Sequence, residues 1–509
     1  MGENSRNADW SALIEEMERR RAFSRGMGGP EKLAKRRADG HMDARQRINE
    51  LVDAGSFREL GILVGGEPIM GLPASPADAL VAGMAKIEGR PILVGSEDFT
   101  VGGGSIGIGN KSKRLRLVSL AEQERVPLVM LLEGAGERTT NVLHRQSIAP
   151  SDLVEMAYLS GKVPTVAAIM GPSAGHGVLI GMLMDFIIIV QGAAMFSAGP
   201  PLVAAATGEL VTKEELGGAE IHTRESGVAH NAASSEKEAL KLIRRYLSYF
   251  PTNAWQNPPS ILPANDGERI LDDILDLIPP NPRQGYDAKK LVDMLADTGS
   301  VLEVQPLFGE TIITALARLG GRPVAVVANQ PLVRAGAIDC DGANKAAHFL
   351  EVADAFHLPV VFLADNPGIM AGTGAERAGT LRCAARMYLA QAQVRSPKLH
   401  VTIRKAYGFG SSLMAMNPCE SQTVTMAFPG VSLNAMPARG GVIASKIDAN
   451  IQASLETAES SGPWAIADTM GFDEIIDPRE LRNALLASLE LAANRDTGGI
   501  VPRPNGIRP

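Results

Sequence analysis

The stretch "VVFLADNPGIMAGTG", residues 360–374, begins as a buried strand and ends in bare backbone. Five apolar residues run into the letters "DNPG", and three small residues follow in "AGTG". A loop with so little side chain can turn its backbone N–H groups toward a ligand, because no side chain blocks the approach. The stretch therefore predicts a core strand whose end is a candidate binding site.

The first half of the chain contains the same pattern. "LLEGAGER" (131–138) occupies the position that "LADNPGIM" occupies in the second half. Two further pairs of segments match in the same order, and the offset between the halves changes only from 232 to 233. These pairs are "GRPILVGSEDFTVGGGSIG" from Gly89 with "GRPVAVVANQPLVRAGAID" from Gly321, and "VPTVAAIMGPSAGHG" (163–177) with "SPKLHVTIRKAYGFG" (396–410). Three elements in nearly constant register indicate an internal duplication.

Short apolar strands alternate with helical stretches in both halves, which predicts an α/β fold with helix-covered sheets. The run "GVLIGMLMDFIIIV" (177–190) is interrupted by Asp185 and indicates a core helix followed by a core strand. The Pro- and Asn-rich segment 249–267 is typical of a linker. We therefore expect one domain over residues 1–260 and a second over 261–509.

The composition of the 509 residues excludes several classes of protein. A net charge of -7 argues against a general nucleic-acid binder, and no segment is typical of a membrane span or a signal peptide. The segment "MERRRAFSR" (17–25) indicates a solvated helix face. Cys340, Cys383 and Cys419 form no metal-binding spacing, and the histidines form no HxxxH pair, so we expect no metal. The cysteines suggest a reducing cytoplasm without structural disulfides.

Paired small-residue loops favour chemistry in which the backbone stabilises negative charge. If a helix begins at such a loop, its unpaired N–H groups favour an oxyanion, such as a thioester enolate. Each half would then hold one carbonyl of a two-substrate reaction. "GPSAGHG" (171–177) and "RKAYGFG" (404–410) could form floors for flat groups, although tight helix–sheet packing also explains them. "TVGGGSIG" (100–107) lacks the GK[ST] of a P-loop.

These residues resemble the carboxyltransferase (beta) subunits of biotin-dependent acyl-CoA carboxylases that act on propionyl-, acetyl- or methylcrotonyl-CoA. The resemblance covers roughly residues 30–480. It is carried by "RINELVDAGSFREL" (47–60), "EDFTVGGGSIG" (97–107), "MGPSAGHG" (170–177), "MFSAGPPLVAAATGELVTKEELGGAEIHTRESGVAH" (195–230), "GRPVAVVANQP" (321–331), "ADNPGIMAGTGAE" (364–376) and "IRKAYGFG" (403–410).

The resemblance implies two tandem crotonase-like domains per subunit. It implies a dimer in which the first domain of one subunit faces the second domain of its partner, and three such dimers in a hexamer. Acyl-CoA is then bound mainly by the first domain, and carboxybiotin approaches from the second.

By the same resemblance, the N–H groups of Ala135 and Gly136 hold the thioester enolate, and those of Ala384 and Ala385 hold the biotin ureido oxygen. No side-chain base is required, because the ureido anion takes the α-proton; Glu133 and Glu137 are expected to be structural. The residues expected to contact substrates are Gly103, Gly104, Gly175, His176, Gly199, Met387, Tyr407, Gly408 and Phe409.

This chain departs from the family at several of these positions. The family often has Gly-Gly at Ala135–Gly136 and Gly-Ala at Ala384–Ala385. Gly374 and Ala375 replace acidic and amide residues, and Phe409 and Ser411 displace an aromatic position. Most of these changes fall in the second domain, so biotin handling is less secure than CoA binding.

The sequence has neither a P-loop nor an "AMKM" biotinylation motif. We therefore expect the biotin carboxylase and the biotin carrier on separate chains. Two alternatives stay open at this level. One is an acyl-CoA decarboxylase or another crotonase-type thioester enzyme that does not use biotin, and the other is a non-catalytic assembly subunit. The identity of the acyl group is left open as well.

Overall fold

In each half of the chain a two-residue β-hairpin turn joins the second and third strands of the sheet. The turn at 88–89 has φ angles of 51° and 76°, and the turn at 320–321 has 57° and 78°. Positive φ at both central positions defines a type I′ turn, whose twist matches that of the flanking strands. Asp53 accepts both N–H groups of the first turn, at 3.0 and 2.8 Å. Asp297 does the same in the second, at 2.9 and 2.6 Å.

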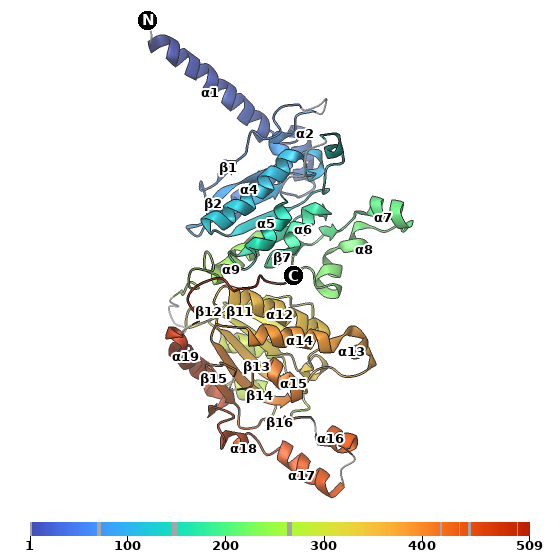
Figure 1. The fold of residues 1–509 in the computed structure, drawn as a ribbon, viewed down its shortest axis with the longest axis vertical. Helices are drawn as coiled ribbons and strands as arrows, with labels where there is room; N and C mark the ends of the chain where they lie inside the picture. Colours follow the sequence, from blue (N-terminus) through green and yellow to red (C-terminus); the bar gives the residue numbers. More distant parts are fainter. Residues whose placement is uncertain are drawn as a thin grey trace. The chain divides into compact units, whose positions relative to one another are not determined.

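The computed structural model describes residues 3–68, 73–144, 151–261, 267–417, 420–436, 438–445, 449–495 and 497–509. The chain divides into two compact units, Met1–Arg245 with Pro509, and Tyr246–Arg508. The first unit runs from blue to green in Figure 1, and the second continues to red. This division comes before the expected one at 260/261. The Tyr246 ring packs against the Phe250 ring, and the Phe250 ring packs against Phe356, so the end of α9 belongs to the second unit.

The first unit contains a mixed sheet in the order β1-β2-β3-β4-β5-β7-β9. The first three strands are antiparallel and the others are parallel. Its strands are β1 (Arg58–Leu60), β2 (Leu80–Ile87), β3 (Arg90–Glu97), β4 (Leu128–Leu132), β5 (Thr165–Ile169), β7 (Phe186–Val190) and β9 (Asn231–Ala233), while β6 (Pro172–Ala174) pairs with β8 (Ala194–Phe196).

The second unit repeats this order as β10-β11-β12-β13-β14-β15-β17, again with an antiparallel start and a parallel remainder. The matching strand order confirms the predicted duplication. Its strands are β10 (Leu302–Val304), β11 (Ile312–Leu319), β12 (Arg322–Asn329), β13 (Val360–Asn366), β14 (Lys398–Tyr407), β15 (Val424–Ala427), β17 (Glu474–Ile475) and, paired with β14, β16 (Ser432–Asn434).

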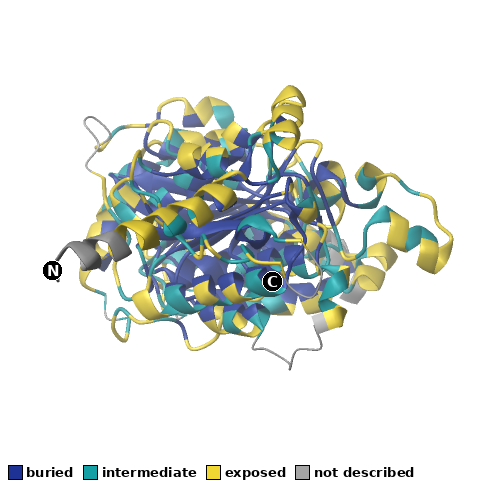
Figure 2. Ribbon diagram, turned by 90° about the horizontal axis from the view of Figure 1, so that it is seen from above, coloured by how far each residue is buried: buried dark blue, intermediate teal, exposed yellow. Residues whose placement is uncertain are grey.

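Helices cover the sheets, and Figure 2 shows buried strands in dark blue beside helices whose outer faces are yellow. The helices of the first half, of which α1 and α7 project away from the sheet in Figure 1, are α1 (Glu3–Arg25), α2 (Pro30–Ala38), α3 (Ala44–Leu51), α4 (Ile108–Glu124), α5 (Asp152–Leu159), α6 (His176–Met182), α7 (Pro200–Thr207), α8 (Lys213–Gly217) and α9 (Glu236–Tyr249). In the second they are α10 (Ile274–Leu277), α11 (Ala288–Leu295), α12 (Cys340–Ala355), α13 (Thr373–Ala378), α14 (Thr380–Ala392), α15 (Gly408–Leu413), α16 (Ala438–Ser445), α17 (Ala449–Glu459), α18 (Trp464–Ala467) and α19 (Leu481–Leu491).

Short 3-10 helical segments and one π-helical segment, η4, complete both units. They are η1 (Pro76–Ala79), η2 (Gly102–Gly104), η3 (Thr139–His144), η4 (Ile221–Glu225), η5 (Arg334–Gly336), η6 (Pro478–Glu480) and η7 (Ala492–Asn494).

Several local expectations are confirmed. The run 177–190 forms most of α6 and then β7, and all of β4 and β13 are buried, as predicted for apolar strands that follow proline. The Arg-rich segment lies on the exposed α1, where Arg19 and Arg20 pair with Glu16. In the described part of the chain, no helix combines the length and apolarity needed to cross a membrane.

The expectation of no disulfide is wrong. Cys340, the first residue of α12, is bonded to Cys383 in α14, with the two Cα atoms 5.1 Å apart. No sequence pattern indicated this bond, because the two cysteines are 43 residues apart and meet only when the helices pack. Cys419 lies outside the described residues.

The bond can be tested by peptide mapping of alkylated protein without reductant. We expect one linked peptide pair that contains Cys340 and Cys383, and we expect reduction or the Cys383→Ser substitution to abolish it. Recovery of both peptides singly alkylated before reduction would contradict the bond.

Candidate functional site

The loop that follows β4 is fixed by the loop that follows β3, backbone to backbone. Ile106 N–H donates to the Gly136 carbonyl at 2.7 Å, and Arg138 N–H donates to the Ile106 carbonyl at 3.0 Å. Gly104 has φ of 67°, and a Cβ atom there would lie 2.3 Å from the Glu133 carbonyl oxygen. The two loops can therefore approach this closely only because residue 104 is glycine.

The second unit repeats this arrangement. Ile338 N–H donates to the Gly368 carbonyl at 3.1 Å, and Met370 N–H donates to the Ile338 carbonyl at 2.8 Å. A Cβ on Gly336 would lie 2.4 Å from the Asp365 carbonyl oxygen. Gly368 is thus the counterpart of Gly136, at the offset of 232 already visible in the sequence. The repeat in the sequence predicts that these loops match, but no pattern in it singles out Gly368.

The amide of Gly136, a buried residue, is unpaired in the part of the first unit that the structure describes. Gly136 has φ of 78°, and among the residues that the structure describes its N–H has no hydrogen-bond acceptor. Ala135 differs, because its N–H donates to the Gly103 carbonyl at 3.0 Å. The expected pair of open amides is therefore reduced to one, and the role predicted for the Ala135 N–H is not supported by this geometry.

A third segment, residues 174–177, borders Gly136. A Cβ on Gly136 would lie 2.7 Å from the Ala174 carbonyl oxygen, and a Cβ on Gly177 would lie 3.8 Å from the Gly136 Cα. Gly175 and His176, both predicted to contact substrate, lie between these two contacts. Their segment begins α6, and the structure brings it together with Gly136.

A buried network of ion pairs anchors the start of the same loop through Glu133. Arg36 and Arg47 pair with Glu133, with contacts of 2.5 and 2.6 Å, and Arg114 pairs with the fully buried Glu97. Burial raises the pKa of Glu97, although the charge of Arg114 opposes this effect. The pairing of Glu133 agrees with its predicted structural role.

Glu137 also has a partner, because Lys111 lies 2.7 Å from its carboxylate. Burial alone would raise the pKa of Glu137, but hydrogen bonds from Lys111 and Asn141 lower it overall. Glu137 is therefore an ion-paired carboxylate in this loop and not a free base.

The remaining predicted residues of the first unit come from three other segments of the chain. Gly103 accepts the Ala135 N–H, and Gly175 N–H donates to the Phe196 carbonyl at 3.1 Å. Gly199 caps the exposed helix α7, and its nearest contact is the Phe196 ring. Gly102 and Arg138 also line a cavity of about 430 Å³, together with Phe23, Met27, Gly28, Lys32, Pro73, Ala74, Ser75, Pro76, Thr100, Val101 and Thr140.

In the second unit, Ala384 and Ala385 do not present open amides. They lie in the second turn of α14, which begins at Thr380, and Cys383 N–H already donates to the Gly379 carbonyl at 3.2 Å. Beyond its first four N–H groups a helix uses its amides internally. The prediction that these two N–H groups bind a ureido oxygen is therefore corrected: in this geometry the helix itself uses both.

The other predicted residues of the second unit lie beside its loop or in its core. Gly408 and Phe409 begin α15, and the Phe409 ring packs 5.3 Å from the Tyr388 ring of α14. The Tyr407 hydroxyl lies 2.6 Å from the Ser432 hydroxyl and donates to Glu459 at 2.7 Å; burial, above all, raises its pKa to about 12. Met387 is fully buried, which favours simple packing for this side chain.

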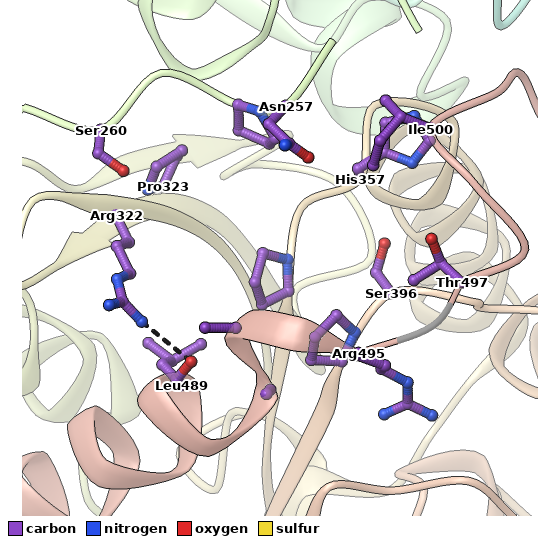
Figure 3. Close-up of a pocket in the computed structure, with 15 residues that line it drawn as sticks. Asn257, Ser260, Arg322, Pro323, His357, Ser396, Leu489, Arg495, Thr497 and Ile500 are labelled. Atoms are coloured by element: carbon purple, nitrogen blue, oxygen red, sulfur yellow. Dashed lines mark hydrogen bonds between the residues drawn. The ribbon is translucent and has the colours of Figure 1, made fainter. Parts of the chain in front are cut away.

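A second cavity, of about 320 Å³, lies at the opposite end of the second sheet (Figure 3). Pro323, Pro359 and Pro397 line it, and they lie at or just before the first residues of β12, β13 and β14. The loop of Gly368 follows the carboxyl end of β13 instead. The cavity in Figure 3 is therefore separate from the candidate site. In the described residues, no group of three or more potential metal-ligating side chains is arranged to hold an ion.

Comparison with known proteins gives a consistent result over most of the chain. Residues 35–505 match the family described as Carboxyl transferase domain. The carboxyltransferase subunit of propionyl-CoA carboxylase from Haloferax mediterranei is 33% identical over 497 residues, covering 95% of this chain and 96% of that protein. Methylmalonyl-CoA decarboxylase subunit alpha from Veillonella parvula is also 33% identical, with the same coverage of both proteins. The transcarboxylase 12S structure, a hexamer with methylmalonyl-coenzyme A bound, superposes with a TM-score of 0.89 at 31% identity over 98% of each chain.

The close passage of the two loops in the first unit predicts a matched difference in stability. Gly104→Ala places a methyl group against the Glu133 carbonyl, whereas Gly89→Ala, at the similar φ of 76°, meets nothing within 4 Å. We expect Gly104→Ala to lower the free energy of unfolding by about 1–3 kcal/mol more than Gly89→Ala, measured by urea denaturation. Equal effects of the two substitutions would show that the loops do not pack as described.

Proposed function

Because this chain belongs to the carboxyl transferase family, as the carboxyltransferase component of a biotin-dependent acyl-CoA carboxylase, we propose that it transfers a carboxyl group from carboxybiotin to an acyl-CoA. The chain is an enzyme with the crotonase-like fold of these carboxyltransferases. The acceptor atom is the α-carbon of the acyl group, or the vinylogous carbon of an unsaturated one. Carboxybiotin is a substrate carried by a partner chain, and it supplies the carboxyl group.

The observation that carries this proposal is the Gly136 amide, which has no acceptor among the described residues. When the α-proton leaves an acyl-CoA, negative charge develops on the thioester oxygen, and a fixed N–H donor stabilises that charge. The peptide units on both sides of this N–H are anchored, because the Ala135 N–H donates to Gly103 and the Gly136 carbonyl accepts from Ile106, so the donor lies in a fixed loop before the charge appears. The first unit would therefore bind the acyl-CoA, in line with the division of roles expected for the two domains.

The contribution of the second unit to biotin binding does not rest on Ala384 and Ala385, whose amides remain inside α14. The counterpart of Gly136 is Gly368, and its N–H donates to the Asn366 side-chain oxygen at 3.0 Å. An oxygen at this position would have to displace the Asn366 amide group. We assign no step of the reaction to these residues.

The rest of the proposal concerns partners, assembly and location. Relatives named as beta chains or carboxyltransferase subunits are matched over nearly their full length, which supports a biotin carboxylase and a biotin carrier on separate chains. The hexameric transcarboxylase 12S supports a homohexamer of facing dimers. A cytoplasmic location rests on the family alone, because the Cys340–Cys383 bond removes the argument from reduced cysteines.

A carboxylation assay across acyl-CoA chain lengths tests the proposal. With biotin carboxylase, biotin carrier, ATP and bicarbonate supplied, we expect carboxylated product from at least one short acyl-CoA, and none when the carrier is omitted. Release of carbon dioxide from malonyl- or methylmalonyl-CoA in the absence of biotin, without carboxylation, would contradict it.

The same assay tests the role of Gly136. We expect Gly136→Ala to lower kcat by about 100-fold, because the added methyl group meets the Ala174 carbonyl and displaces the N–H donor. Gly192→Ala is the matched control, since Gly192 has φ of 81° and nothing within 4 Å. An equal loss in both variants would assign the effect to backbone strain.

A further inference from the structure

The Cys340–Cys383 bond joins two segments that belong to the loop arrangement of the second unit. Cys340 follows closely after Ile338, whose carbonyl accepts the Met370 N–H at 2.8 Å. Cys383 lies at the far end of the segment that follows Met370, residues 371–382. The residues around Cys340 therefore anchor both ends of segment 371–382, one end by a backbone hydrogen bond and the other by a covalent bond.

Segment 371–382 has few attachments between these two ends. Its helix α13 contains no buried residue, and a Cβ atom on Gly372 or Gly374 would meet nothing within 4 Å. Among the residues that the structure describes, those from 371 to 378 form hydrogen bonds only within the segment, such as the Glu376 N–H to the Gly372 carbonyl at 3.0 Å. The order of the segment therefore depends on how its ends are held.

The two sulfurs of the bond differ in exposure and share one hydrogen-bond donor. Cys383 is 5% exposed, whereas Cys340, the first residue of α12, is half-buried. Asn344 Nδ2 lies 3.4 Å from the Cys383 sulfur and 3.5 Å from the Cys340 sulfur. The Arg386 guanidinium donates to Asn344 Oδ1 at 3.4 Å, which orients the amide nitrogen toward the sulfurs. An attacking thiol would therefore reach Cys340, and Asn344 would stabilise Cys383 as the leaving thiolate.

We propose that the Cys340–Cys383 bond is a thiol–disulfide exchange site, reduced by a dithiol, that controls the order of segment 371–382. A thiolate of the dithiol attacks the Cys340 sulfur, the S–S bond breaks, and Cys383 leaves as a thiolate and takes up a proton. The second thiol of the dithiol then displaces Cys340. The cysteine pair gains two electrons and two protons, and the dithiol is oxidised to its own disulfide. The proposed cytoplasmic location favours this role, because cytosolic disulfides are usually transient and catalytic or redox-sensing.

Reduction of the bond leaves the segment attached at Met370 and through the packing of α14 on α12. The segment follows the Gly368 loop of the second unit, the half that takes carboxybiotin in the proposed function. The oxidised form holds this side in one arrangement. The reduced form binds the biotin carrier less well, because the segment must then be ordered on binding. This kinetic consequence rests on the proposed function, whereas the control of order does not.

Amide hydrogen exchange tests the control of order. We expect the amides of 371–382 to exchange about tenfold faster after dithiothreitol treatment than in the oxidised wild type, because one of the two end attachments is lost. Cys340→Ser and Cys383→Ser should exchange at the faster rate with or without the reductant. Cys419→Ser is the matched control and should respond as the wild type does. Equal exchange in oxidised and reduced wild type would overturn the proposal, as would a response lost in Cys419→Ser, which would assign the exchange to another cysteine pair.

The carboxylation assay separates the inference from the proposed function. We expect reduction to raise KM for the biotin carrier about tenfold, since ordering a flexible segment on binding costs affinity, while KM for the acyl-CoA stays the same. Cys340→Ser should show the raised carrier KM in both redox states. A carrier KM that is equal in both states of the wild type, or lower after reduction, would sink the inference alone. A segment whose order changes on reduction, in an enzyme that carboxylates nothing in either state, would sink the proposed function alone.

Discussion

The close approach of two backbone loops is the constraint on which the candidate site depends. In each unit, a glycine after the third strand passes against a carbonyl at the end of the fourth, with no room for a Cβ atom. This approach lets Ile106 and Ile338 bond the carbonyls of Gly136 and Gly368. The Ala135 N–H and the Gly136 carbonyl are both hydrogen-bonded, so the peptide units on either side of the Gly136 N–H are anchored by the backbone and not by a flexible side chain.

The two units share this arrangement of loops but differ in the residues next to the matched glycines. Among the described residues of the first unit the Gly136 N–H has no acceptor, and the adjoining segment carries His176, whose ring contacts the buried Asp152. In the second unit the matched glycine N–H is bonded to Asn366, and Phe409, the counterpart of His176, stacks on Tyr388. A charged, polar loop suits a developing oxyanion, while an aromatic wall suits a flat apolar ring. The proposed division of substrates between the domains would follow from residues that the duplication did not preserve.

Much of the fold could be predicted because its signals are local. Pro127 and Pro359 introduce buried apolar strands, and equal spacing between matched segments revealed the repeat. The site was predicted less completely, because the availability of an amide depends on where a helix starts. Gly379 caps α14 without a side-chain hydrogen bond, so nothing in the sequence placed the start of that helix ahead of Ala384. The Cys340–Cys383 bond and the Asp152–His176 pair depend on packing between distant segments, which no local pattern reports.

The most direct measurement is a crystal structure of the protein with a short-chain acyl-CoA bound. We predict that the thioester oxygen lies within hydrogen-bond distance of the Gly136 nitrogen, with the acyl chain passing His176. A thioester oxygen bound at another position in the first unit, with the Gly136 N–H facing solvent or a protein acceptor, would contradict the central claim.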